Sequence, residues 1–261
     1  MLREELELLK NFAIHGWDRR YIEQGMARTA FLFKIISQYV DLEDKMVLDL
    51  GCGIGNVSIL GSQCSSCIVG LDISSVKLKR AKWRLSLRRL RKPGLVNGDA
   101  LRLPFAGGVF DLVITYDLYE HITDKHALLE EIFRVTSKNG FLVLTTGNRL
   151  FPLDRHTLLW FVDYLPKKLA NQYVRLMNRR RIYDVSQPSY WSLWKKFRKY
   201  FRIVTIDGDS ALKMIEDVYP EYLERYWGIV PLLESLVKMG IFKFITPKYI
   251  VISQKIRSGC T

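Results

Sequence analysis

The sequence predicts an α/β fold in which about seven strands form one sheet with helices on both of its faces. Three observations support this prediction. Short apolar segments alternate along the chain with longer segments of helical pattern. Several of the apolar segments end in an aspartate, and the first of them, Met46–Leu50, leads directly into a glycine-rich turn. Because parallel strands end at the same edge of such a sheet, these features are typical of a domain that binds a nucleotide-like ligand there.

Residues 2–40, which precede the first strand, have the apolar periodicity of two helices. The second of these helices is expected to run from about Tyr21 to Tyr39. We expect both to pack over the mouth of the ligand site, so residues 1–45 are interpreted as an N-terminal helical cap. Trp17 and Tyr21 are expected to pack in the core, and closure of the site by their rings is the alternative.

The turn after Leu50 contains glycine at positions 51, 53 and 55 and predicts a cofactor site. Glycine permits a sharp turn and a close approach of a ligand to the backbone. The following segment is helical in pattern, and the N–H groups at the start of a helix are available to a ligand. A dinucleotide motif would have its third glycine one residue later, where this chain has Asn56. Two alternative interpretations of the turn are the nicotinamide-binding loop of an oxidoreductase and a glycine loop that arose by chance.

The next two strands are each expected to end in an aspartate. Ile68–Ile73 contains Asp72, which follows the glycines by about twenty residues, the spacing at which a nucleotide-binding fold has its ribose-binding carboxylate. Leu95–Ala100 contains Asp99 in the same position relative to its strand. An aspartate at a strand end is also a common turn former or helix cap. Asp49, Asp72 and Asp99 lie in three consecutive strands in register with one glycine turn, and this combination favours a ligand site.

The later elements complete the alternation. The fourth and fifth strands are Val109–Thr115 and Phe141–Thr146, with a helix at about 128–134 between them. The sixth strand is Phe201–Ile206 and the last is Tyr249–Ser253. The connections that precede these two strands are longer than ordinary loops, and we expect them to build the substrate chamber. The resulting segments are a cofactor-binding core at 46–148, a lid at 149–200, and a sheet-completing segment at 201–261 with a helical insertion at 210–247.

Residues 45–148 resemble the class I S-adenosylmethionine (SAM) dependent methyltransferases, whose first motif is a strand with an acidic residue followed by G-x-G-x-G. The resemblance implies a Rossmann-like sheet and SAM as the cofactor. In that family the residue corresponding to Asp49 supports the loop more often than it contacts the cofactor, while Asp99 would accept from the adenine amino group. The cofactor-binding residues implied in this way are Asp49, Gly51, Gly53, Gly55, Asp72, Ile73, Asp99, Ala100 and Tyr116.

A second group of polar residues follows the fourth strand and comprises Asp117, Glu120 and His121. A similar run occurs in quinone-pathway O-methyltransferases and in enzymes that methylate the terminal ribose of small RNAs, where it binds a divalent cation. Here Asp117 replaces the usual first glutamate, and His156, after the fifth strand, can supply a further ligand. Oxygen and imidazole donors suit Mg²⁺, Mn²⁺ or Fe²⁺. The preferred interpretation is a metal-free one in which Glu120, His121 and His156 act as base or substrate contacts, and a purely structural role stays open.

The composition is that of an intracellular globular enzyme. Of the 261 residues 48% are hydrophobic, and charged residues interrupt every apolar stretch before it reaches the ~20 residues that a membrane span needs. The N-terminal residues are acidic where a secretory signal would be basic. We therefore expect a cytoplasmic protein, with peripheral attachment to a membrane surface as a variant. Cys64 and Cys67 form a lone C-x-x-C, which predicts free thiols and no zinc site.

The net charge of +13 is the least expected property of the chain. Basic residues concentrate at Lys77–Lys92, Arg179–Arg181 and Lys195–Lys199. In the first of these segments Val76, Leu87 and Leu90 are expected to face the sheet, which leaves a basic face in water. The alternative is a surface that contacts RNA or an acidic membrane.

These observations predict a SAM-dependent methyltransferase that modifies a small organic acceptor, apolar or aromatic in character, at oxygen. The aromatic residues of the long connections favour such an acceptor. The chain lacks the N-P-P-Y type of sequence found in enzymes that methylate exocyclic amines of bases. The alternatives are an RNA methyltransferase that uses the basic surface and a protein that keeps the fold for binding only.

Overall fold

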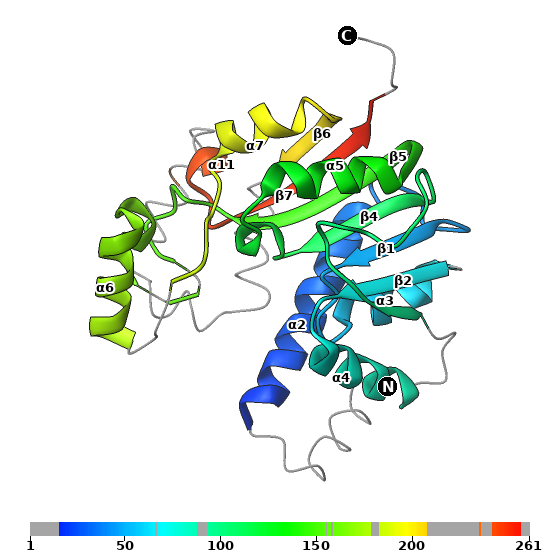
Figure 1. Ribbon diagram of the computed structural model, residues 1–261, viewed down its shortest axis with the longest axis horizontal. Helices are drawn as coiled ribbons and strands as arrows, with labels where there is room; N and C mark the ends of the chain where they lie inside the picture. The colour runs from blue at the N-terminus through cyan, green and yellow to red at the C-terminus, as the bar shows by residue number, and fades with distance from the viewer. Residues whose placement is uncertain are drawn as a thin grey trace. The chain divides into compact units, whose positions relative to one another are not determined.

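The computed structural model describes residues 16–65, 67–87, 93–154, 156–157, 159–178, 183–207, 235 and 242–256. Seven strands form one sheet in the order β3-β2-β1-β4-β5-β7-β6 (Figure 1). The strands are β1 Met46–Leu50, β2 Cys67–Asp72, β3 Gly94–Asn97, β4 Phe110–Tyr116, β5 Thr136–Gly147, β6 Phe201–Asp207 and β7 Lys248–Lys255. β1 pairs in parallel with β2 and β4, β2 pairs in parallel with β3, and β6 is antiparallel to β7. The predicted α/β class and the number of strands are confirmed.

Helices alternate with these strands, as the periodicity predicts. The α-helices are α2 Gly16–Ile36, α3 Asn56–Cys64, α4 Ser75–Ser86, α5 Lys125–Val135, α6 Lys167–Asn178, α7 Tyr190–Phe197 and α11 Phe242–Ile245. Two short 3₁₀ helices are η1 Tyr119–His121 and η2 Val162–Tyr164. Among the described residues, no helix combines the length and the apolar character that crossing a bilayer would need.

The chain divides into two compact units. The first comprises residues 1–116, 131–142 and 257–261, and the second comprises residues 117–130 and 143–256. In the first unit β1 lies between two parallel neighbours, so its apolar side chains are buried in the core. α2 packs beside α3, where Ile22 and Met26 join Ile59 and Leu85 in one apolar cluster. This core holds the glycine turn after β1 on rigid elements.

The buried face of α4 differs from the predicted one. Val76 is 62% exposed, whereas Leu78, Ala81 and Leu85 face the core. The hydroxyl of Ser74 accepts a hydrogen bond from the Lys77 N–H and caps the helix, so that Val76 falls in the outward-facing part of its first turn. The expectation that Val76 faces the sheet was therefore wrong. Leu87 is half-buried, and Leu90 lies outside the described residues.

The second unit contains the two antiparallel strands and the long connection from 149 to 200. β7 is buried from Tyr249 to Ile252, and α7 packs against β6. The connection folds into η2, α6 and α7 and thus has helical structure of its own. Several predictions fall outside the described residues: the first N-terminal helix, the side chains of Trp17 and Tyr21, and nearly all of the insertion at 210–247.

Candidate functional site

The glycine turn has the backbone conformation that the sequence predicts. Gly51, Gly53 and Gly55 have φ angles of 77°, 55° and 83°, in the left-handed region that favours glycine. The N–H groups of Gly51 and Cys52 both donate to the carbonyl of Leu71, at 2.7 and 2.9 Å, which ties the turn to the end of β2. A Cβ built on Gly53 would meet no atom within 4 Å. The backbone at Gly53 therefore has open space beside it, where a ligand can approach.

Asp72 supports this turn from the end of β2. One carboxylate oxygen accepts from the Gly53 N–H and the other from the Ser74 N–H, both at 2.8 Å. The side chain is 6% exposed. A carboxylate has about four lone-pair sites, so these two bonds leave acceptor capacity for a ligand. The structure thus gives Asp72 a role in the turn, and ribose binding stays a prediction.

Asp49 lies below the turn and is almost completely buried. One of its oxygens accepts from the Ser58 N–H at 2.9 Å and from the Ser58 hydroxyl at 2.6 Å, so it caps the first turn of α3. Burial raises the pKa of Asp49 to about 7, the Ser58 hydrogen bonds lower it, and the charge of Asp72 raises it. The observed partner is the helix after the turn, and not the turn itself.

The remaining predicted cofactor residues lie at the ends of neighbouring strands. Ile73 is 73% exposed directly after β2, a large exposure for an isoleucine. Asn97, at the end of β3, donates to the carbonyls of Asp72 and Ile73, both at 2.9 Å, and so links the two strand ends. Asp99 is exposed and its side chain accepts from the Leu101 N–H. Ala100 is buried, and Tyr116 ends β4 half-buried.

Arg84 is a buried residue of this site that the sequence reasoning missed. Its side chain is 1% exposed, and one guanidinium nitrogen donates to the Ile54 carbonyl and to the Asn56 side chain, both at 2.7 Å. These bonds connect α4 to the glycine turn and to the start of α3. One feature of the sequence could have identified Arg84 as buried. It lies three residues after Ala81, on the buried stripe of a helix whose other basic residues are solvated.

Replacing Arg84 with methionine is expected to lower the free energy of unfolding by about 1–3 kcal/mol, because the partly buried Ile54 carbonyl loses its donor. The affinity for S-adenosylhomocysteine (SAH), the demethylated product of SAM, should fall as well, because the turn is less well held. Chemical denaturation and calorimetry measure the two effects. The matched control is Arg80→Met, on the exposed face of the same helix. Equal SAH affinity in the two variants would contradict the role given to Arg84.

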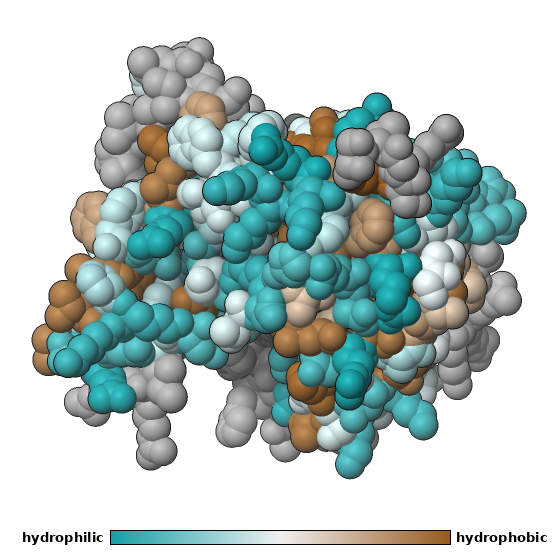
Figure 2. All heavy atoms as spheres, turned by 45° about the horizontal axis from the view of Figure 1, so that its top comes forward, coloured by the Kyte–Doolittle hydropathy of each residue, from teal (hydrophilic) through white to brown (hydrophobic). Residues whose placement is uncertain are grey.

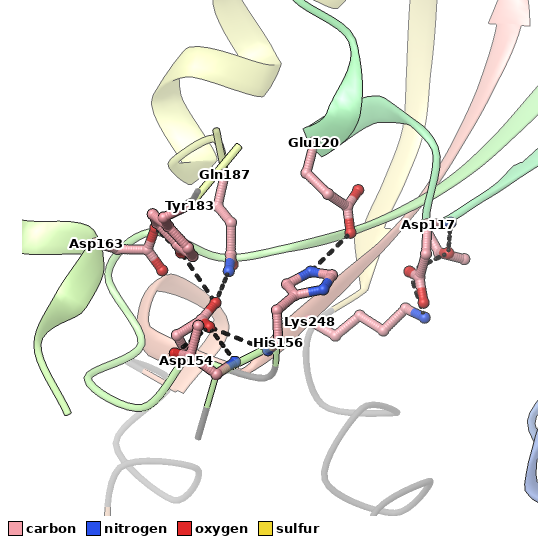
Figure 3. Close-up of polar contacts among 10 residues, drawn as sticks. Asp117, Glu120, Asp154, His156, Asp163, Tyr183, Gln187 and Lys248 are labelled. Carbon is pink, nitrogen blue, oxygen red and sulfur yellow. Dashed lines mark hydrogen bonds and ion pairs between the residues drawn. The ribbon is translucent and has the colours of Figure 1, made fainter. Parts of the chain in front are cut away.

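A second polar group lies in the second unit, and Figure 3 shows its side chains. Glu120, in η1, is completely buried, and its carboxylate oxygen lies 3.8 Å from His156 Nε2. The His121 and His156 rings are 5.3 Å apart, edge to face. One ligand atom from each of these three residues lies within 4.8 Å of the others. The structure therefore brings together three residues that the sequence singled out.

Asp117 is separate from this group. Its carboxylate oxygen lies 2.7 Å from Lys248 Nζ and accepts from the Thr145 hydroxyl at 3.0 Å. Lys248 is 1% exposed, so Asp117 supplies the negative charge that a buried ammonium requires. Asp117 has a φ of 54°, which the bonds from its own N–H to Thr145 help to hold. The prediction of Asp117 as a fourth metal ligand receives no support from this arrangement.

Asp154 anchors the turn that carries His156 (Figure 3). One oxygen of this buried carboxylate accepts from the His156 N–H at 3.1 Å and from the N–H and hydroxyl of Thr157, both at 2.7 Å. The other accepts from the Tyr183 hydroxyl at 3.0 Å and from the Gln187 amide at 2.8 Å. Five donors on one aspartate fix the backbone at His156.

The Tyr183 hydroxyl also contacts a second carboxylate, because Asp163 lies 2.9 Å away. One phenolic proton cannot be donated to both acids, so the arrangement is complete only when Asp163 is protonated and donates to Tyr183. Burial raises the pKa of Asp163 to about 6, the Tyr183 bond lowers it, and the charge of Asp154 raises it. Burial and the two acids raise the pKa of Tyr183.

Replacing Asp163 with asparagine is expected to stabilise the protein at pH 8 relative to wild type. Between about pH 4 and 6 the unfolded aspartate has lost its proton while the folded one keeps it, so wild-type stability falls as pH rises through this window. An asparagine amide donates to Tyr183 at every pH. Denaturation at several pH values should show the advantage of the variant growing up to about pH 6 and then levelling off. Asp44→Asn, at an exposed site, is the control substitution. An advantage that does not change with pH would contradict this account.

Comparison with known proteins identifies the family. Residues 48–144 match the family described as Methyltransferase domain, and this segment contains the glycine turn, Asp72 and Asp99. This segment is a class I SAM-dependent methyltransferase domain. The family and the Rossmann-like fold predicted from the sequence are thereby confirmed.

The chain is similar to several curated proteins. It is 36% identical over 216 residues to the chloroplastic tocopherol O-methyltransferase of Arabidopsis thaliana, across 77% of this chain and 61% of that protein. It is 22% identical over 242 residues to the ubiquinone biosynthesis O-methyltransferase of Pelagibacter ubique, across 86% of this chain and 97% of that protein. The chain thus spans less than two thirds of the length of the plant relative.

Solved structures agree with the fold. A SAM-dependent methyltransferase from Mesorhizobium loti superposes with a TM-score of 0.57 at 15% identity, over 85% of this chain and 95% of that one. At this identity the likeness concerns the fold alone.

Proposed function

We propose that this methyltransferase transfers the methyl group of SAM to an oxygen atom of a small apolar or aromatic acceptor. The observation that carries the proposal is the buried Glu120 carboxylate beside the His156 imidazole, because this pair can accept the proton that an acceptor hydroxyl must lose. The names of the relatives described above, both O-methyltransferases, support oxygen as the methylated atom.

Three features of the first unit support SAM as the ligand of the glycine turn. The open backbone at Gly53 admits a ligand, Asp72 retains acceptor capacity for ribose hydroxyls, and Ile73 offers an exposed apolar surface to a flat ring. Asp99 and Ala100 would complete the adenine site. When bound, SAM supplies a methyl group already activated by its sulfonium. Alignment of the acceptor with that methyl then accounts for much of the catalysis, up to ~7–11 kcal/mol in favourable intramolecular cases.

Deprotonation of the acceptor is the remaining chemical task. A phenol has a pKa of about 10, so at neutral pH its proton needs a base. Glu120 favours the His156 tautomer that carries its proton on Nε2, the atom 3.8 Å from the carboxylate. The Nδ1 atom then has a free lone pair and takes the proton of the acceptor hydroxyl. Asp154 keeps the imidazole in position by holding the His156 backbone.

A divalent cation is the second candidate for this task. Glu120, His121 and His156 would hold it, since their ligand atoms lie within 4.8 Å of one another, and such donors suit Mg²⁺, Mn²⁺ or Fe²⁺. The cation would lower the pKa of the acceptor hydroxyl. We favour the metal-free base, because Glu120 is completely buried and already faces an imidazole nitrogen.

Incubation with SAM carrying a radioactive methyl group, followed by fractionation of the products, tests the acceptor class. The substrates are a lipid extract, total RNA and a pool of small phenols, each offered separately. Label in the lipid or phenol fraction is expected. Label in RNA alone would favour the RNA methyltransferase alternative, and SAM binding without transfer to any fraction would favour a binding protein. Cytoplasmic location, free or at a membrane surface, is part of the proposal and is tested by cell fractionation.

A further inference from the structure

We propose that the surface around α6 docks onto an anionic lipid bilayer. This surface, called the α6 surface below, belongs to the second unit and contains none of Glu120, His121 and His156. Its six apolar or aromatic residues are Trp160, Phe161, Tyr164, Leu169, Leu176 and Met177. The inference concerns attachment to lipid and does not depend on the identity of the methyl acceptor.

The residues of the α6 surface are unusually exposed for their type. Leu176 is 81% exposed, Met177 57% and Phe161 56%. Single exposed apolar residues are common on proteins, but contiguous groups mark sites of contact with a partner or a membrane. Here three of the residues lie on one helix and three in the turn immediately before it. Such a group is typical of a surface that contacts a partner or a membrane.

The core of the second unit does not need these residues, because α6 already buries a different face. Ala170 and Val174 are almost completely buried, in a cluster with Leu159, Val162, Tyr183 and Val185. Leu169 and Leu176, seven positions apart, share an adjacent face of the helix. The helix is therefore apolar over more of its circumference than its packing uses.

Positive charge borders the exposed leucines. Lys168 and Arg175 each precede one of them by a single position, so a cationic row runs beside the apolar row. α6 contains no acidic residue, and the sequence continues into Arg179–Arg181. At the left edge of the face drawn in Figure 2, the side on which Figure 1 draws α6, hydrophobic and hydrophilic atoms lie side by side. An apolar face bordered by lysine and arginine is typical of helices that lie in a membrane interface.

The turn before α6 adds aromatic rings to this surface. Phe161 has a φ of 58°, which is strained for a bulky residue, and the bond from its N–H to the Pro152 carbonyl and the bridge between Leu153 and Trp160 hold it. Its ring centroid lies 6.1 Å from that of Trp160 and 5.8 Å from that of Tyr164. Tryptophan and tyrosine are enriched where membrane and water meet. These contacts hold an exposed aromatic cluster in place against the backbone strain.

A bilayer can accommodate both the exposed apolar residues and the basic row of the α6 surface. A second copy of this chain would carry the same charge, +13 over the whole sequence, and would repel the basic row. RNA would bind the basic row and leave Leu169 and Leu176 in water. An anionic membrane admits the leucines to the acyl boundary while the lysine and arginine heads stay among the lipid phosphates. The chemistry of the α6 surface therefore fits acidic phospholipid.

Sedimentation of the full chain with vesicles tests the proposal. We expect binding to phosphatidylcholine vesicles that contain phosphatidylglycerol, and weak binding to phosphatidylcholine alone. The variant Leu169→Ser/Leu176→Ser should lower the partition coefficient at least about tenfold, because two leucines no longer leave water. Lys168→Gln/Arg175→Gln should lower it by about fivefold per charge, and only with anionic lipid. Val76→Ser and Lys79→Gln/Lys82→Gln, exposed positions on the basic helix α4, are the matched controls and should bind as wild type.

Three outcomes would overturn the proposal. The first is wild-type binding to neither kind of vesicle at low salt, and the second is equal losses in the α6 and α4 variants. The third is a dimer in sedimentation equilibrium, or an RNA complex in a gel shift, that the leucine substitutions abolish while vesicle binding stays unchanged. Circular dichroism and SAH affinity, both expected to equal those of wild type, confirm that each variant is folded. SAH binding also separates a failure here from a failure of the proposed function.

Discussion

Replacing Asp72 with alanine is expected to weaken the binding of SAH by roughly 10- to 150-fold, corresponding to about 1.5–3 kcal/mol. The variant removes the carboxylate that would accept from the ribose hydroxyls. It also removes the acceptor of the Gly53 N–H, so the glycine turn loses one of its anchors. Isothermal titration calorimetry of wild type and variant measures the difference directly.

An SAH analogue without the two ribose hydroxyls separates these effects. If Asp72 binds ribose, wild type should discriminate strongly against the analogue, and Asp72→Ala should bind SAH and the analogue with similar affinity. This comparison is a double-mutant cycle with the ligand as one partner. Equal discrimination by both proteins would remove Asp72 from the ribose site and leave it only its observed role in the turn.

The second large effect is expected at His156. Replacement by alanine should lower kcat by about 100-fold or more, since general acid–base catalysis contributes roughly 10²- to 10⁴-fold. SAH affinity should be unchanged, because the residue belongs to the proposed acceptor site. The matched control is His126→Ala on α5, where the imidazole is exposed beside Glu130, and its kcat should equal that of wild type.

Chelation distinguishes the base from the metal at the same three residues. The base proposal predicts full turnover in excess chelator, because the imidazole then accepts the proton without a cation. Loss of turnover in chelator, with recovery on addition of a divalent cation and SAH binding intact throughout, would instead establish a metal at Glu120, His121 and His156.

The proposed cofactor site of the first unit was predictable because its determinants are local. Gly51, Gly53 and Gly55 each need a left-handed backbone, and that requirement is visible in the sequence as glycine at fixed spacing after an apolar strand. Asp72 was predictable for the same reason, because its strand length and its distance from the glycines follow from the fold. The three residues at Glu120, His121 and His156 came from a resemblance, and the structure supplied their proximity.

The residues that sequence reasoning missed are buried polar groups with distant partners. Arg84 bonds to residues about thirty positions earlier in the chain, and Lys248 pairs with Asp117 across a far greater separation. In the sequence Asp154 cannot be distinguished from an ordinary turn residue. In the folded chain Tyr183 and Gln187 donate hydrogen bonds to its carboxylate. A charged residue is expected at the surface unless its partner is known, and partners so far apart appear only in the folded chain.

Nuclear magnetic resonance of the reaction product tests the central claim most directly. The enzyme is supplied with SAM whose methyl carbon is isotopically labelled and with a phenol or hydroquinone that carries an alkyl chain. The account predicts that the label appears at the chemical shift of a methyl group bonded to oxygen, and that His156→Ala produces little of this product. Label bonded to nitrogen or to ring carbon, or transfer that is unaffected by His156→Ala, would contradict it.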